Sequence, residues 1–198
     1  MIGGYVRFLS AVFLGTGICL LPAVGAAAGR IGWQTYKNDE LGFSLRYPPS
    51  MAAYTGDQAA SGGLFKGTNK PDVRFTLPVP YDESHIYGAD VAVFADREGF
   101  CSQPPSWTSP SVLAGRQFRR YSDYTSGGTG STIEFEVYST VYRQKCLSIM
   151  IAIQTYRYDD PRTPQEWERT ETLRQAAKAL LIQVVHSLEL LGPSHQNE

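Results

Sequence analysis

The feature that most constrains the fold is a change in hydrophobic period late in the chain. Residues 131–142 read STIEFEVYSTVY, in which Ile133, Phe135 and Val137 alternate with polar neighbours. A period of two is typical of a β-strand. Residues 164–186 instead repeat apolar side chains at helical spacing. This order predicts the α+β class, in which a long C-terminal amphipathic helix covers a mainly antiparallel β-sheet.

The segments on both sides of that change carry further signals. Residues 146–156 form the most hydrophobic predicted strand, and the nearly continuous apolar run at 149–153 favours a central strand covered on both faces. Residues 163–166 read TPQE, a capping box with proline at the first helical position. We therefore expect the helix to run from Pro164 to His186.

A second clear signal lies near the start, where residues 33–48 read WQTYKNDELGFSLRYP. Side chains alternate on both sides of a polar connection that contains Gly42, which predicts a β-hairpin. Pro48 ends the second strand because proline has no N–H to donate to the ladder. The remaining expectations are loops at 52–63 and 98–107, strands at 64–66, 73–77 and 89–94, a turn at 144–145 and, as alternatives, short helices at 53–60 or 110–113.

The N-terminus has the composition of a secretory signal peptide. Arg7 precedes an apolar run at residues 8–21, and alanines at 26–28 supply small residues for cleavage. The apolar run is shorter than the roughly 20 residues that span a bilayer comfortably. We therefore expect the protein to be periplasmic or secreted, without stable membrane insertion after cleavage.

The predicted boundaries are a signal peptide at 1–28, a single α+β domain at 29–192 and a flexible tail at 193–198. Two alternatives stay open. One is an uncleaved anchor, and the other is a lipid anchor on Cys19. Against the second, Ile18 is larger than the residue that lipoprotein signals place before the cysteine.

After the leader, the chain contains two cysteines, Cys101 and Cys146. In an oxidising compartment the simplest expectation is a disulfide between them. A C-x-x-C redox motif is absent from the sequence, and two isolated cysteines without nearby histidines make a poor zinc site. Closing a loop of this size contributes about 4 kcal/mol in the chain-entropy model.

The charge argues against two classes of partner. The formal net charge is −1 for the full sequence, and it becomes −2 when Arg7 leaves with the signal peptide. A nearly neutral chain without a basic run does not favour nucleic acid or an anionic membrane as the main partner. We expect the partner to be a protein or small ligand of the cell envelope, and we expect no cofactor.

Two polar segments are candidate sites. Residues 81–85 read YDESH and bring Asp82 and His85 close in sequence, which are residue types used by metal sites and by acid–base catalysis. A solvated loop is the simpler interpretation. Residues 126–131 are rich in glycine, but a strand follows and no lysine is present, so we expect a hairpin turn rather than a phosphate-binding loop.

Other patterns also fail to identify a catalytic residue. Glu134 and Glu136 share one face of a predicted strand and could form a carboxylate pair for sugar chemistry, but a solvated face is the simpler expectation. The sequence has no G-x-S-x-G motif. Tyrosine is abundant, with 12 residues, which raises a tyrosine-lined binding groove as an alternative, although ordinary half-buried sheet tyrosines are the simpler expectation.

The opening stretch has the form Y-x-N-x-x-x-G-F-S-x-x-Y-P, and a V-x-S-L-like stretch ends the predicted helix. The first motif is carried by Tyr36, Asn38, Gly42, Phe43, Ser44, Tyr47 and Pro48. This resembles the PsbP-like domain, and also many small bacterial secreted proteins and lipoproteins. The resemblance implies an antiparallel sheet flanked by helices and a non-enzymatic binding or assembly role. It covers the two ends of the domain, and the Cys101–Cys146 bond is an addition to it.

Two functional hypotheses follow. The first is a secreted or periplasmic, non-enzymatic binding or assembly module. The second is an extracytoplasmic hydrolase that uses Asp82, His85 or Glu134, which requires at least two of these groups to converge in one pocket.

Overall fold

The computed structural model describes residues 32–61, 64–65, 70–79, 85–95, 98–102, 105–128, 130–156 and 163–192. The expected signal peptide and C-terminal tail lie outside these ranges, so their boundaries stay predictions. Residues Gly32–Glu198 form one compact unit, and the description below concerns that unit. No helix in the described ranges is both long and apolar enough to cross a bilayer.

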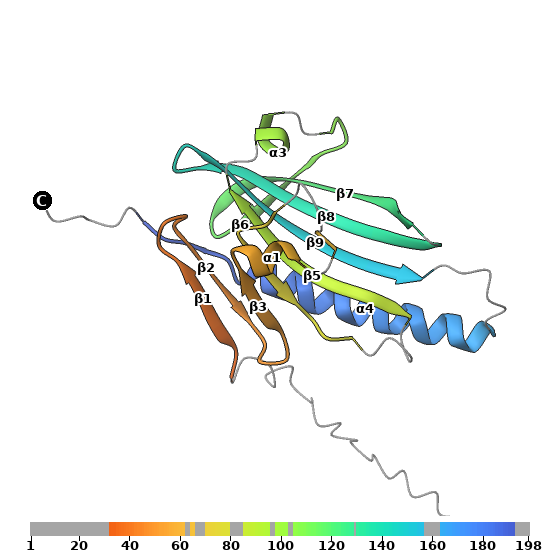
Figure 1. The fold of residues 1–198 in the computed structure, drawn as a ribbon. Helices are drawn as coiled ribbons and strands as arrows, with labels where there is room; N and C mark the ends of the chain where they lie inside the picture. Colours follow the sequence, from red (N-terminus) through yellow and green to blue (C-terminus); the bar gives the residue numbers. More distant parts are fainter. Residues whose placement is uncertain are drawn as a thin grey trace, which may run out of the picture. The chain divides into compact units, whose positions relative to one another are not determined.

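The larger of the two sheets described has seven antiparallel strands (Figure 1). In spatial order they are β3 (Ala52–Thr55), β4 (Val73–Thr76), β5 (Ile86–Ala95), β9 (Lys145–Tyr156), β8 (Ser131–Tyr142), β7 (Arg116–Gly128) and β6 (Ser109–Leu113). Strand β9 pairs with β5 and β8 along most of its length. Both of its faces are covered, because Ile149 and Ile151 on one side and Ser148 and Ala152 on the other are all buried. The expected central strand is therefore confirmed.

The smaller sheet joins the two ends of the described unit. It contains β1 (Gln34–Asn38), β2 (Phe43–Tyr47) and β10 (Glu189–Leu190), with β2 in the middle. Strands β1 and β2 form the hairpin predicted at 33–48. Gly42 has φ of 73° in the turn, and a Cβ atom there would collide with the Arg143 side chain. The position therefore favours glycine for its backbone conformation, whereas the flexible end of the Arg143 side chain could move away from a Cβ atom.

Helix α4 (Pro164–His186) lies on one face of the seven-stranded sheet (Figure 1). It begins with the predicted capping box: the Glu166 N–H donates to Thr163 Oγ1 at 3.3 Å, and the Thr163 N–H donates to the Glu166 carboxylate at 2.7 Å. The C-terminal half of the helix is closely packed, with Ala177 and Leu181 buried in the main core. The predicted α+β class, an antiparallel sheet under a C-terminal helix, is confirmed.

The opposite face of the sheet is covered by short elements. Helix α3 (Glu98–Ser102) brings Phe100 to 5.8 Å from the Phe94 ring, and Phe65 lies 5.6 Å from the same ring, measured between centroids. Helix α1 (Asp57–Ser61) follows β3. Phe65 and Phe94 belong to a second, smaller apolar cluster on this face, and Phe100 packs against it.

Several local predictions were wrong where elements are short. The expected loop at 52–63 contains β3 and α1, and the expected loop at 98–107 contains α3. Residues 110–113 belong to β6, and Leu64 lies in a turn rather than a strand. The last hairpin turns at Arg143 and Gln144, one residue earlier than expected, with both φ angles positive. The short strands β3 and β6 are stabilised by pairing with β4 and β7, which the pattern of each segment alone does not report.

The assignment of sheet faces was also wrong. A solvated face was the simpler expectation for Glu134 and Glu136, but this is the face on which α4 lies. Glu136 is only 2% exposed. These carboxylates tolerate the position because cationic side chains contact both of them, as described next.

Candidate ligand cleft beside helix α4

The sheet face under α4 contains a buried charge, Glu136. Its carboxylate accepts hydrogen bonds from the Arg120 guanidinium at 2.8 and 3.0 Å and one from the Tyr138 hydroxyl. Burial raises the pKa of this carboxyl, but the hydrogen bonds from Arg120 and Tyr138 outweigh it and hold the pKa below its usual value. Glu136 is therefore ionised and engaged through both oxygens, which suits a structural anion better than an acid or base.

Glu134 lies on the same face but in a more open position. Its carboxylate accepts hydrogen bonds from Arg174 and Lys178, both on α4, and its side chain is 31% exposed. Arg174 also donates to both carboxylate oxygens of Glu171, at 2.7 and 2.8 Å. The hydrogen bonds from Arg174, and to a smaller extent one from Gln175, lower the pKa of Glu171 to about 2. Arg174 thus bridges a strand carboxylate and a helix carboxylate.

An open cleft of about 630 Å³ adjoins this network. Its walls come from β7, β8, β9 and the N-terminal half of α4. The lining residues are Ser122, Asp123, Tyr124, Thr132, Glu134, Thr155, Tyr156, Trp167, Thr170, Glu171 and Arg174. Its volume lies within the range of about 300–1,000 Å³ that is typical of small-molecule sites.

Aromatic side chains line the cleft. Tyr124 on β7 is 75% exposed and Trp167 on α4 is 43% exposed. Tyr156, at the end of β9, lies at the same cleft and contacts the ring of Tyr87 at 5.2 Å between centroids. Exposed rings of this kind offer a flat apolar surface together with a polar edge.

Thr170 supplies an unsatisfied polar group to the cleft. The residue is 5% exposed, and in the described part of the chain its hydroxyl has no hydrogen-bond partner. A buried hydroxyl without a partner carries a desolvation penalty that a ligand group or an ordered water can remove. Thr170 is among the residues that line the cleft, with this oxygen buried in its wall.

The structure brings together only part of what the sequence singled out. Glu134 lines the cleft, but His85 is not among the lining residues, and Asp82 lies outside the described residues. The convergence that a hydrolase at Asp82, His85 and Glu134 requires is therefore not observed among the described residues. Among these residues, no group of three or more His, Cys, Asp or Glu side chains is placed to hold a metal ion.

The contribution of α4 to the cleft was not predicted from the sequence. Trp167, Thr170 and Arg174 lie on one stripe of α4, in line with the buried Ala177 and Leu181 further along. Polar residues at Thr170 and Arg174 interrupt that otherwise apolar stripe. A polar interruption on the sheet-facing side of a helix is the signal that could have identified this site.

Comparisons with known proteins give structural neighbours. No family model matches the sequence, and no curated protein matches it. The chain is similar to the solution structure of cyanobacterial PsbP (CyanoP) from Synechocystis sp. PCC 6803, with 13% identity and a TM-score of 0.43, over 84% of this chain and 96% of the other. It is also similar to LpqN of Mycobacterium tuberculosis, a protein involved in cell envelope biogenesis, with 11% identity and a TM-score of 0.42, over 81% and 91% of the two chains. The first neighbour is a PsbP, which is the family that the 36–48 stretch resembles.

Proposed function

We propose that this protein is a non-enzymatic binding module of the periplasm or the extracellular space, and that the cleft beside α4 holds a small hydroxyl-rich ligand of the saccharide class. The observation that carries this proposal is the unpartnered hydroxyl of Thr170 in a cleft with exposed aromatic rings. The extracytoplasmic location is supported by the predicted signal peptide and by the disulfide between Cys101 and Cys146.

The cleft chemistry favours a sugar over an apolar ligand. The C–H face of a sugar ring can lie against the rings of Tyr124 and Trp167, while its hydroxyls meet donors and acceptors around them. Asp123 and Glu171 offer acceptors, and Arg174 offers donors. Each sugar hydroxyl can donate and accept, so it complements Thr170 Oγ1 in either role.

The direct test is binding of a saccharide panel to the purified mature protein, measured by calorimetry and by NMR shifts. Thr170→Val keeps the side-chain shape and removes the hydroxyl. We expect it to weaken binding roughly tenfold, corresponding to about 1.4 kcal/mol. Thr172→Val is the matched control, because Thr172 is exposed and its hydroxyl already donates to the Glu168 carbonyl oxygen at 2.8 Å.

A second pair of variants tests the aromatic contribution. Trp167→Ala is expected to weaken saccharide binding, whereas Trp107→Ala, which removes a tryptophan that is 61% exposed and outside the cleft, is expected to leave it unchanged. Absence of saccharide binding, or binding that is equal in Thr170→Val and Thr172→Val, contradicts the proposal. Release of a cleaved saccharide during the titration contradicts the proposal that the protein is non-enzymatic, and it supports the hydrolase hypothesis instead.

Export is tested separately by fractionating cells that express the full chain. We expect the protein in the extracytoplasmic fraction with residues 1–28 removed, as determined by mass spectrometry. Retention of the leader on a cytoplasmic protein contradicts the location.

A further inference from the structure

The outer face of the large sheet, which is the face turned away from α4, carries an unexpected apolar region. Glu134 on β8 points toward α4, where it contacts Arg174 and Lys178. Because side chains alternate along a strand, Ile133 and Phe135 lie on the outer face. An antiparallel sheet normally directs its apolar side chains to the covered face and its polar ones to water. In this part of β8 the order is reversed.

The neighbouring strands extend this apolar region into a pocket, called here the outer pocket. Phe135 pairs with Ala152 on β9, and Ile133 pairs with Thr125 on β7. Paired residues point to the same side of a sheet, so these side chains share the outer face. A cavity of about 280 Å³ lies over them. The lining residues are Leu64, Phe65, Phe94, Phe100, Tyr121, Thr125, Ile133, Phe135, Met150 and Ala152.

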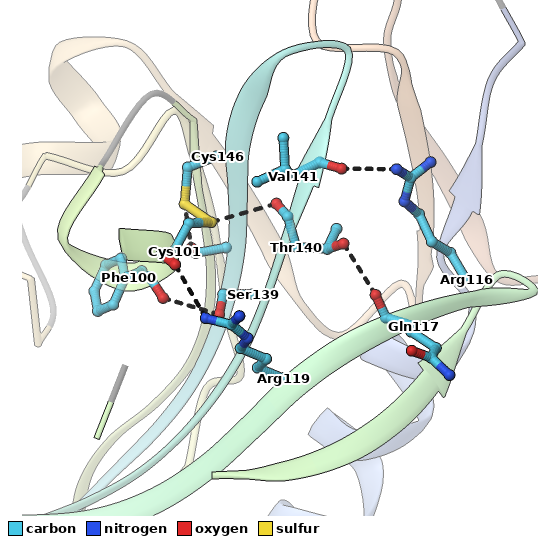
Figure 2. The surroundings of a disulfide bond; sticks show 10 residues. Phe100, Cys101, Arg116, Gln117, Arg119, Ser139, Thr140, Val141 and Cys146 are labelled. Carbon is cyan, nitrogen blue, oxygen red and sulfur yellow. Dashed lines mark hydrogen bonds between the residues drawn. A yellow bond between two sulfur atoms is a disulfide. The ribbon is translucent and has the colours of Figure 1, made fainter. Parts of the chain in front are cut away.

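The inner end of the outer pocket is closed by phenylalanines. The Phe94 ring lies 5.6 Å from the Phe65 ring and 5.8 Å from the Phe100 ring, measured between centroids. Phe65 and Phe94 are buried. Phe100 is held in place by its neighbour, because the disulfide from Cys101 to Cys146 ties α3 to β9 with the Cα atoms 5.8 Å apart (Figure 2). The inner wall is therefore fixed to the sheet.

The other end of the outer pocket opens at the edge of β7. Strand β6 pairs with β7 only at residues 116–120, so among the described strands β8 is the one neighbour of β7 beyond that point. Ile133 is half-buried there, and Thr125 is exposed. The hydroxyls of Tyr121 and Thr125 supply polar groups at this end. Asp123 lies between them on β7, and after burial its charge is the second cause that raises the pKa of Tyr121.

The outer pocket suits apolar atoms better than water. Among the described residues that line it there is no charged side chain. Water gains few hydrogen bonds in an apolar cavity, so apolar groups fill such a space more favourably. The most exposed large hydrophobic side chains of the described residues, such as Trp107 and Tyr124, all lie outside the pocket. Its apolar surface is thus recessed, which fits an inserted chain better than the flat surface of a protein.

We propose that the outer pocket binds the alkyl chain of a small amphiphile, whose neutral or positively charged head group lies at the β7 edge. The pocket volume is close to the lower limit of about 300 Å³ for small-molecule sites, which suits a single chain. The flexible side chain of Met150 can adjust to it. The Asp123 carboxylate disfavours an anionic head group. The outer pocket shares no lining residue with the α4 cleft, so the proposal is independent of saccharide binding.

The test uses the mature, oxidised protein and probes that contain no sugar. The first probes are 1-butanol, 1-hexanol and 1-octanol, followed by octyltrimethylammonium and octanoate. Saturable shifts are expected in the methyl NMR signals of Leu64, Ile133, Met150 and Ala152. Alcohol affinity is expected to rise about fourfold for each added CH₂ group. Octanoate is expected to bind more weakly than octyltrimethylammonium.

Two variants test the position of the chain. Ile133→Asn places a polar amide in the pocket and is expected to weaken 1-octanol binding at least tenfold. Val141→Asn is the matched control, because Val141 is also β-branched, lies on the same strand and face, and is outside the pocket. Thr125→Trp obstructs the open end at an exposed position, so it is expected to weaken binding similarly without changing a buried residue.

Three results overturn the proposal: wild-type methyl shifts that are absent or centred outside the pocket, alcohol affinity that does not rise with chain length, and equal affinity in Ile133→Asn and Val141→Asn. Thr125→Trp keeps the variant test decisive if Ile133→Asn fails to fold. Tighter binding of octanoate than of octyltrimethylammonium overturns the head-group assignment. Sedimentation of the ligand-free protein covers the other occupant, because a dimer that Ile133→Asn abolishes assigns the pocket to a second copy and overturns the alkyl-chain proposal.

Discussion

The two halves of α4 lie over the same sheet but meet it differently. In the packed half, residues 177–185, apolar side chains including Ala177 and Leu181 are buried against the strands. In the open half, residues 167–174, the stripe in line with them carries Thr170 and Arg174, and a cleft remains. One continuous helix therefore both closes the core and borders a candidate site, because the residue types along one stripe change.

The same contrast recurs in the strand below. Glu136 is buried and held by Arg120 and Tyr138, whereas Glu134 is partly exposed at the cleft and contacts Arg174. The carboxylate of Glu136 thus has a structural role, whereas the carboxylate of Glu134, two residues earlier on the same face, is accessible at the cleft. The comparison predicts that the same substitution lowers the free energy of unfolding by different amounts at the two positions.

The largest difference is expected between Leu181→Ala and Trp167→Ala. Leu181 is fully buried, and its truncation leaves a cavity that costs about 3 kcal/mol in the free energy of unfolding. Trp167 is 43% exposed at the cleft, so its truncation is expected to cost less than about 1 kcal/mol. Urea unfolding of both variants measures this. Equal losses would contradict the division of the helix into a packed and an open half.

A smaller difference is expected between Glu136→Gln and Glu134→Gln. The first variant removes the charge from a buried pair, at a cost of about 2 kcal/mol, below the usual range for buried pairs because the Arg120 side chain is 43% exposed. The second affects a partly exposed cluster and is expected to cost less than about 1 kcal/mol. Comparable urea midpoints for the two variants would show that Glu136 is no more structural than Glu134.

The structural role of Glu136 also predicts an acid-dependent effect. Its pKa is lower in the folded state than the ordinary value of 4.5, so the unfolded chain binds the proton more readily. The stability from its ionised form is present above pH 4.5 and is lost as the pH falls through the folded-state pKa. The gap in unfolding free energy between the wild type and Glu136→Gln is therefore expected to narrow from pH 7 to pH 3. A gap that stays constant would be incompatible with this shift.

The smallest effect is expected at Thr170, and it has the opposite sign. Thr170→Val removes an unpartnered buried hydroxyl without changing the side-chain shape, so it is expected to stabilise the ligand-free protein by about 1 kcal/mol or less. Thermal unfolding without ligand measures this gain. A loss of stability would indicate that the hydroxyl has a structural partner and would weaken the case for the open half as a binding site.

The sequence predicted the elements whose signals are local. The hairpin at 33–48, the central strand at 146–156 and the capping box before α4 all follow from periodicity and from residue types at fixed spacing. The disulfide between Cys101 and Cys146 is also present, as the count of cysteines after the leader predicts.

The sequence did not predict which sheet face meets the helix. Alternation separates Glu134 and Glu136 from Phe135, but it does not reveal which set lies under α4. The packing of charged residues there depends on Arg120 from β7 and on Arg174 and Lys178 from α4. The candidate cleft was missed for the same reason, because its walls are distant in sequence and meet only after the strands pair.

The short strand β10 constrains the order in which the small sheet can form. Glu189 and Leu190 pair with Ser44 and Phe43, so the last strand of the small sheet lies 145 residues from its partner. Contacts of such separation form slowly, since a long loop must close first. Until β10 pairs with it, one edge of β2 has unpaired N–H and C=O groups. An exposed strand edge of this kind promotes aggregation. A chain that ends before Glu189 would retain that edge permanently, so completion of the C-terminus protects the N-terminal hairpin.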